Sequence, residues 1–184
     1  MVFVAGIIGS ELAPTKSLST LPVATIVVGT ALSVIPVIRL MSIFGRKKVF
    51  LSACIYSILL IGLCIFSITK EIFFLFSFAS FCLGATVATM MQFRFAAIEN
   101  VNLEQRASAT AVVLLGGLIS AFLGTEIATI GKSILETDFA GSFLLLALLF
   151  IIAFVLMIFF EPATKFKEHK EKSKRPLIDI ITQG

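Results

Sequence analysis

The sequence contains little charge, and charge is absent from long stretches of it. Only 14% of its 184 residues are charged, against about 25% in a typical soluble domain. No Asp, Glu, Lys, Arg or His occurs between Leu21 and Ile38 or between Val49 and Thr69. Hydrophobic residues make up 58% of the chain, and 19 residues are Phe, which so short a protein could not hide from water. The sequence therefore excludes a water-soluble fold and predicts an integral membrane protein.

Residue types that carry chemistry are also scarce. The single His, His169, lies among Lys and Glu, and we expect it to be exposed and without a ligand. The three cysteines, Cys54, Cys64 and Cys82, all fall in apolar stretches, and an odd number without paired spacing predicts packing rather than disulfides or a metal site. The sequence shows no Ser-His-Asp set, phosphate-binding loop or zinc motif. We therefore predict a protein that is not an enzyme, without catalytic residues, cofactor or metal.

Five stretches are long and apolar enough to cross a bilayer. A spanning helix needs about 20 mostly apolar residues, and residues 21–41, 49–69, 72–93, 108–130 and 139–160 meet this requirement. The first nine residues are too short to cross, and we interpret them as the outer end of a further span whose first half is missing. The expected fold is all-α: a polytopic membrane helix bundle over residues 1–160, followed by a basic linker or tail over 161–184.

The cations indicate how these spans are threaded, because Lys and Arg accumulate in cytoplasmic loops. If the spans alternate in direction, one side receives Arg39, Arg46, Lys47, Lys48, Arg94, Arg106 and the six cations of the tail. The other side receives only Lys16, Lys70 and Lys132. We therefore predict a multi-pass protein of the bacterial inner membrane whose tail is cytoplasmic. The excess of positive charge is concentrated in the short stretch KFKEHKEKSKR of this tail, so nucleic acid is not an expected partner.

Small residues spaced four apart form stripes on three of the predicted spans. The stripes are Thr25, Gly29 and Ser33; Ser80, Gly84 and Ala88; and Gly116, Ser120, Gly124 and Ala128. Such stripes allow membrane helices to approach closely, so helix packing is the simplest interpretation. The alternative is that these helices rock against each other or line a polar path. Spacing alone leaves both interpretations open.

Four polar residues near the ends of spans are candidates for a solute or ion path: Glu11, Gln92, Arg94 and Glu126. A charge at the centre of a bilayer costs at least about 2.5–3.5 kcal/mol, which makes ionisable groups within spans functional candidates. Each of these four can instead extend to the membrane–water interface. An interfacial role and a role in a central cavity, where acids bind cations or protons and Arg binds an anionic group, both remain open.

The loop after the first complete span resembles the signature of the major facilitator superfamily, Gly-x-x-x-Asp-Arg-x-Gly-Arg-Lys/Arg. Gly45, Arg46 and Lys47 match its second half. In its first half, the family's Gly, Asp and Arg are replaced by Ile38, Ser42 and Ile43.

Two further features are similar to that family. Ser120-x-x-x-Gly124-Thr125 resembles the Gly-x-x-x-Gly-Pro element of its proton antiporters, with Ser in place of the first Gly and Thr in place of Pro. The basic tail resembles the cytoplasmic linker between the two six-helix halves of the family.

The resemblance implies the N-terminal six-helix half of a secondary transporter (uniporter, symporter or proton antiporter) of a small solute. Gly45, Arg46 and Lys47 would form a conformational motif in the inner loop. The implied partners are the lipid bilayer, a small molecule or ion, and a second six-helix half. A functional half, a fragment and a frameshifted remnant are all compatible with the chain. The rival interpretation is a structural or assembly subunit that transports nothing.

Overall fold

The computed structural model describes residues 2–99, 101–132 and 139–159. Its α-helices are α1 (Val2–Leu12), α2 (Leu21–Phe44), α3 (Arg46–Thr69), α4 (Phe73–Met90), α5 (Phe93–Glu99), α6 (Arg106–Lys132) and α7 (Ala140–Phe159). Two short 3-10 turns, η1 (Lys16–Leu18) and η2 (Leu103–Gln105), lie before α2 and α6. The predicted tail, with His169, lies outside the described residues.

The described helices follow from the long apolar stretches, because a backbone in lipid must satisfy its hydrogen bonds within its own segment. Five helical segments are long and apolar enough to cross a membrane. The expected all-α bundle is therefore confirmed. The 11-residue α1 is about 16 Å long, since each residue rises about 1.5 Å. It can cover only about half of a hydrocarbon core roughly 30 Å thick.

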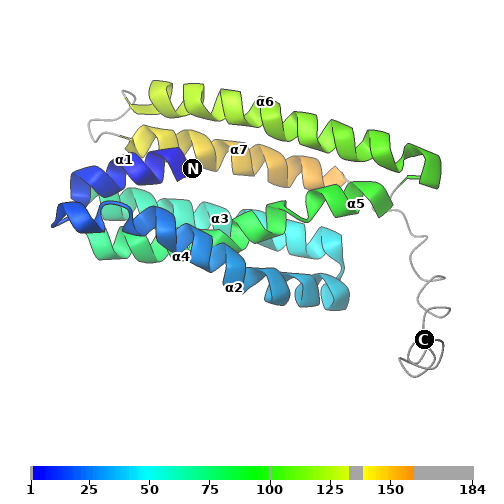
Figure 1. The fold of residues 1–184 in the computed structure, drawn as a ribbon, viewed down its shortest axis with the longest axis horizontal. Helices are drawn as coiled ribbons and strands as arrows, with labels where there is room; N and C mark the ends of the chain where they lie inside the picture. Colours follow the sequence, from blue (N-terminus) through cyan, green and yellow to red (C-terminus); the bar gives the residue numbers. More distant parts are fainter. Residues whose placement is uncertain (1, 100, 133–138, 160–184) are drawn as a thin grey trace, which may run out of the picture.

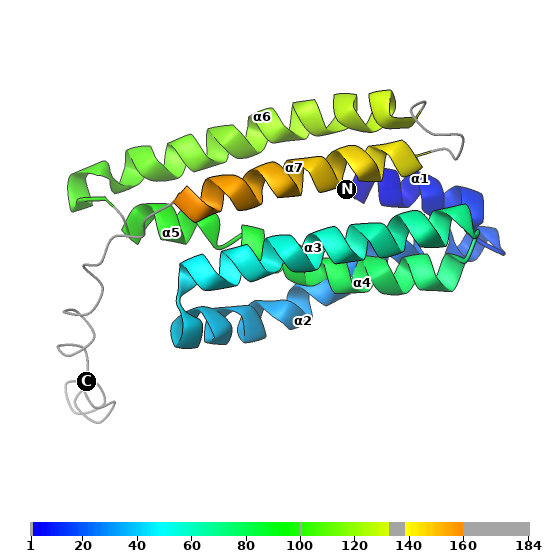
Figure 2. The same cartoon turned by 180° about the vertical axis from the view of Figure 1, so that it is seen from behind.

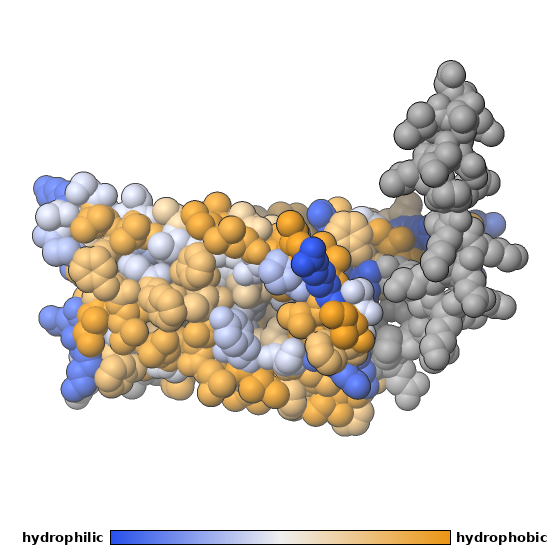
Figure 3. Space-filling view, turned by 90° about the horizontal axis from the view of Figure 1, so that it is seen from below, coloured by the Kyte–Doolittle hydropathy of each residue, from blue (hydrophilic) through white to orange (hydrophobic). Residues whose placement is uncertain are grey.

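The helices lie side by side along the long axis of the molecule, and their connections alternate between its two ends (Figures 1 and 2). At one end are the α2–α3 turn and the connection from α5 to α6; at the other are η1 and the α3–α4 turn. The surface seen in Figure 3 is hydrophobic along most of its length, with hydrophilic residues gathered towards both ends. This distribution fits a bundle surrounded by lipid with its ends in water.

The described cations divide between the two ends in the expected way. Arg46 and Lys47 begin α3, and Arg106 begins α6, so all three lie at the end with the α2–α3 turn. Lys16 in η1 and Lys70 after α3 lie at the opposite end. That the first of these ends faces the cytoplasm stays a prediction.

The closest helix pair is α2 with α4, where two of the small-residue stripes meet. A Cβ placed on Gly84 would lie 2.7 Å from the carbonyl oxygen of Ile26, and one on Gly29 would lie 3.0 Å from the carbonyl carbon of Phe81. Neither helix could approach so closely with a larger side chain. Thr25, from the same stripe, donates a hydrogen bond from Oγ1 to the carbonyl oxygen of Ser77, 3.1 Å away. The sequence prediction of helix packing is confirmed for these two stripes.

The helix pair α3 and α4 is joined by a buried polar bond. Ser57, on α3, is completely buried and its hydroxyl lies 2.7 Å from the hydroxyl of Thr86 on α4. Such a bond between membrane helices contributes about 0.6 kcal/mol on average, so most of the stability of this pair must come from packing. Its main value is to hold the two helices at one relative register.

Candidate functional site

The predicted span over residues 72–93 is occupied by α4, and a short break separates α4 from α5, which begins at the last residue of that span. At the break, the Gln92 N–H bonds to the carbonyl oxygen of Thr89, three residues back instead of four. The helical pattern resumes when the Ala96 N–H bonds to the carbonyl oxygen of Gln92. Two of the four path candidates, Gln92 and Arg94, therefore lie at or just after an interruption in a membrane helix.

One face of α5 is held against α3 by an aromatic stack. The rings of Phe93 and Phe50 are 4.3 Å apart at an angle of 13°. Phe50 itself is only 2% exposed and belongs to a buried cluster that includes Ala96 of α5. With these contacts on one side, α5 has a defined orientation, although it contains only seven residues.

Arg94 lines a pocket between the break and α6. The pocket has a volume of about 230 Å³, and its other lining residues are Met90, Met91, Val113 and Leu114. The Arg94 guanidinium carbon lies 4.9 Å from the centre of the Phe95 ring, within the range of a cation–π contact. Arg94 is exposed, and among the described residues it forms no hydrogen bond or ion pair with another side chain. The pocket is therefore apolar except for one positively charged group.

The other path candidates lie elsewhere. Glu126 is on α6, 12 residues beyond Leu114, which places it about 18 Å along the helix from the Arg94 pocket. Glu11 is in the last turn of α1, and both acids are exposed. The four residues do not share a pocket within the described part of the chain, so their common role in a path stays a prediction.

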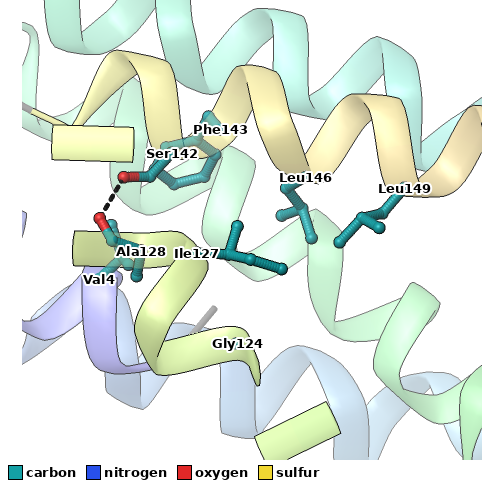
Figure 4. A pocket seen from close by; sticks show the side chains of 8 residues that line it. All are labelled: Val4, Gly124, Ile127, Ala128, Ser142, Phe143, Leu146 and Leu149. Atoms are coloured by element: carbon teal, nitrogen blue, oxygen red, sulfur yellow. Dashed lines mark hydrogen bonds between the residues drawn. The ribbon is translucent and has the colours of Figure 1, made fainter. Parts of the chain in front are cut away.

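A smaller apolar pocket of about 70 Å³ lies between α1, α6 and α7 (Figure 4). Val4, Gly124 and Phe143 are among its lining residues, and none of the four path candidates is. The Ser142 hydroxyl donates a hydrogen bond to the carbonyl oxygen of Ala128 at 2.7 Å, which closes α6 against α7 at this point. With its only hydroxyl occupied in this way, the pocket offers a packing defect rather than a polar binding site.

The inner-loop motif has a clear conformational basis at its glycine. Gly45 alone separates α2 from α3, with φ 85° and ψ 154°. This backbone region is open essentially only to Gly. The glycine of the motif is therefore required by a turn of one residue that reverses the chain.

The lysine of the motif caps another helix. Lys47 Nζ donates a hydrogen bond to the carbonyl oxygen of Ile158 in the last turn of α7, 2.8 Å away. Carbonyl groups at a helix C-terminus lack partners within the helix, and a nearby cation also interacts favourably with the helix dipole. The contact joins the first turn of α3 to the last turn of α7, next to the predicted linker.

We expect Lys47→Met to loosen the end of α7. Loss of the cap should cost about 0.3–1 kcal/mol, while the aliphatic side chain of Met keeps the packing. Hydrogen exchange should accelerate in the last turn of α7. Lys48→Met is the matched control, because the neighbouring Lys48 is exposed, and equal acceleration in both variants would contradict the capping role.

The third small-residue stripe contacts another helix only at its C-terminal end, where the buried Ala128 accepts a hydrogen bond from Ser142 of α7. A Cβ on Gly116 or Gly124 would meet nothing within 4 Å, and Ser120 is exposed. The assignment of these three residues to helix packing therefore stays a prediction, unlike that of the stripes on α2 and α4.

Several residues of the site carried no signal in the sequence. Met90, Met91, Val113 and Leu114 are apolar residues in apolar spans, and the break contains neither Pro nor Gly. The partner of Lys47 is a backbone carbonyl, which any residue would provide. Only the arrangement of the helices brings these groups together.

Comparison with known proteins gives three relatives, all of which are named as transporters. The chain is 30% identical over 190 residues to the riboflavin transporter RfnT of Brucella anthropi. The aligned region covers 98% of the chain and 46% of RfnT. It is 31% identical over 162 residues to the uncharacterized transporter YdeG of Bacillus subtilis, covering 85% of the chain and 37% of the relative. A third relative, the uncharacterized transporter YddS of Bacillus subtilis, is 26% identical over 171 residues, which is 90% of the chain and 39% of the relative.

The chain thus spans less than half the length of the curated relatives it matches. No solved structure matches it. Residues 1–182 match the sequence pattern of the Major Facilitator Superfamily, in agreement with the Gly45 turn and the five spanning helices. With relatives and pattern both covering nearly all of it, the chain belongs to the Major Facilitator Superfamily and is a multi-pass membrane protein of a transporter family.

Proposed function

We propose that the chain forms the N-terminal half of a secondary transporter that moves a small organic solute across the bacterial inner membrane. The observation that carries this proposal is the match of residues 1–182 to a transporter family, by a chain that spans 46% of a riboflavin transporter. In this proposal the protein catalyses no chemical reaction. It works as a uniporter, a symporter or a proton antiporter, with its tail in the cytoplasm.

A second six-helix half completes the path in this proposal. Members of the family alternate access by rocking two helix bundles about a site near the midplane. The exposed part of the stripe on α6 supports such an assembly, since Gly116 and Gly124 leave room for a close neighbour. Gly116→Val should then leave the chain itself folded but weaken its association with the second half. If the DNA that flanks the coding region encodes further apolar membrane spans, this would support a second half encoded by the same gene.

Transport is tested by reconstituting the chain into vesicles with the part of RfnT that it does not match. Riboflavin is the first solute to measure, because the relative at 30% identity is named as a riboflavin transporter. We expect uptake when both parts are present and none with either part alone. No flux in any combination, with a partner protein bound in a fixed ratio, would instead favour the structural subunit.

The path candidates are tested in the same vesicles. Arg94→Ala and Glu126→Ala should each lower the uptake rate about tenfold or more, since losing a hydrogen bond to a charged group costs about 1.5–3 kcal/mol. Arg106→Ala is the control, because Arg106 is an exposed cation at the start of α6 outside the Arg94 pocket. Uptake unchanged in the first two variants would assign both residues to the interface.

A further inference from the structure

The pocket at the α4–α5 break combines an apolar wall with a cation near the end of a membrane-spanning segment. Four of its five lining residues are Met, Val or Leu, and the fifth is Arg94. The break lies within a segment long and apolar enough to cross the membrane, residues 73–98. A cation at such a place is costly unless it finds a partner or water. This cost makes the surroundings of Arg94 informative.

Among the side chains that the structure describes, no carboxylate lines the pocket around Arg94. The Arg94 guanidinium contacts the face of the adjacent Phe95 ring. That contact places the guanidinium group near an aromatic face. Arg presents five donors in a rigid fork that matches a carboxylate or a phosphate, which suits it to binding such a group.

The pocket wall also specifies what the anion is attached to. The Met90 and Met91 thioethers are flexible and polarizable, and they adapt to apolar or aromatic surfaces. Val113 and Leu114 of α6 complete the apolar lining opposite the break. The volume of about 230 Å³ is below the roughly 300 Å³ at which whole small-molecule sites begin. It accommodates an anionic group and a short apolar segment.

The pocket is also kept in shape from behind. The Phe93–Phe50 stack and the buried Ala96 fix α5 against α3, so Arg94 is carried by an anchored segment. We infer that the pocket formed by Met90, Met91, Arg94, Val113 and Leu114 binds an anionic group, carboxylate or phosphate, borne on an apolar body. The anion is either the head of a solute or the headgroup of a phospholipid. The site itself does not depend on the proposed transport function.

Binding is measured on the purified full chain in nanodiscs of phosphatidylcholine. Unfolding is followed with a thiol-reactive fluorogenic dye, because Cys54 and Cys64 are buried in the folded chain. We expect octanoate and octyl phosphate to raise the unfolding midpoint by several degrees. Octanol and octyltrimethylammonium, with the same chain but no negative charge, should not. An equal rise with octanol would overturn the inference, because the charge would then contribute nothing.

Variants assign the effect to the pocket. In Arg94→Gln the dissociation constant for octanoate should rise about tenfold or more. Arg94→Lys should give a smaller rise because it keeps the charge but loses the fork. Arg106→Gln, outside the pocket, should bind as the unaltered chain does. Octanoate binding that is the same in Arg94→Gln as in the unaltered chain would refute the site.

A second pair of variants tests the cavity without altering Arg94. Val113→Phe fills the pocket and should abolish the octanoate effect. Val112→Phe is its control, since Val112 is 67% exposed and does not line the pocket. If Val113→Phe binds octanoate normally, the anion lies elsewhere and the inference is wrong.

The source of the anion is decided by adding phosphatidylglycerol to the nanodiscs. If the native occupant is a lipid, this addition should raise the midpoint only when Arg94 is present, and octanoate should then add nothing. If it is a solute, the octanoate effect should persist with phosphatidylglycerol. Since neither assay measures flux, binding that depends on Arg94 without any transport would refute the proposed function and leave the site intact. Transport without binding that depends on Arg94 would refute the site and leave the proposed function intact.

Discussion

Gly84→Val should prevent the normal packing of α2 on α4 and destabilise the chain by about 3 kcal/mol or more. The added side chain would start from a Cβ that lies 2.5 Å from the carbonyl carbon of Gly29 and 2.7 Å from the carbonyl oxygen of Ile26. Both atoms belong to backbone, so relief requires a shift of a whole helix. Overpacking of this kind typically costs about 1–3 kcal/mol, and more where the backbone must move. Denaturant unfolding in mixed micelles measures the loss.

Gly116→Val is the control for Gly84→Val. Gly116 is also in the middle of a spanning helix, but a Cβ there would meet nothing within 4 Å. We expect the stability of the chain to change by no more than about 0.5 kcal/mol, as for substitutions away from packed features. Equal destabilisation by both variants would show that Gly84 matters through helix propensity and not through the crossing with α2.

Phe50→Ala should have the second large effect, at about 3 kcal/mol. Phe50 is 2% exposed and packs in a cluster with Val37, Ala88 and Ala96, which come from α2, α4 and α5. Its removal leaves a cavity where these helices meet and takes away the ring on which Phe93 stacks. Besides lowering stability, the change should accelerate hydrogen exchange across residues 93–99, because α5 loses its anchor.

The matched control for Phe50→Ala is Phe78→Ala. Phe78 lies on α4 but is 59% exposed, so the lost contacts are mainly with the surrounding medium. We expect it to change stability much less and to leave hydrogen exchange in α5 unchanged. If α5 exchanges at its normal rate in Phe50→Ala, the aromatic stack does not hold the segment that carries Arg94.

The general architecture could be predicted from the sequence because lipid leaves the backbone few options. A long stretch without charge must form a helix if it enters a bilayer, and a helix that crosses must be followed by a turn and a return. The motif indicated a connection around Gly45, but the predicted spans left a loop over residues 42–48 where the structure has Gly45 alone, with a positive φ. The family resemblance was confirmed over residues 1–182.

Which faces of the helices are buried could not be predicted, and Phe74 and Phe76 show why. They lie two residues apart on α4, yet Phe74 is 67% exposed and Phe76 is completely buried. In water, the polar residues of a helix would mark its outer face. In lipid both faces are apolar, since the surrounding tails resemble the protein interior, and the pattern that distinguishes inside from outside disappears.

The sequence by itself determined the medium, the helical class, the alternation of cations between the two ends and the three stripes where helices could meet. Only the tertiary structure decided that two stripes pack on each other while Gly116, Ser120 and Gly124 of the third remain exposed. It also placed Arg94 among Met and Leu side chains at a break in its helix, and Lys47 on the carbonyl of Ile158. The physical reason is that composition and period are properties of one segment. Contacts between helices depend on how several segments pack together, and these segments are almost uniformly apolar.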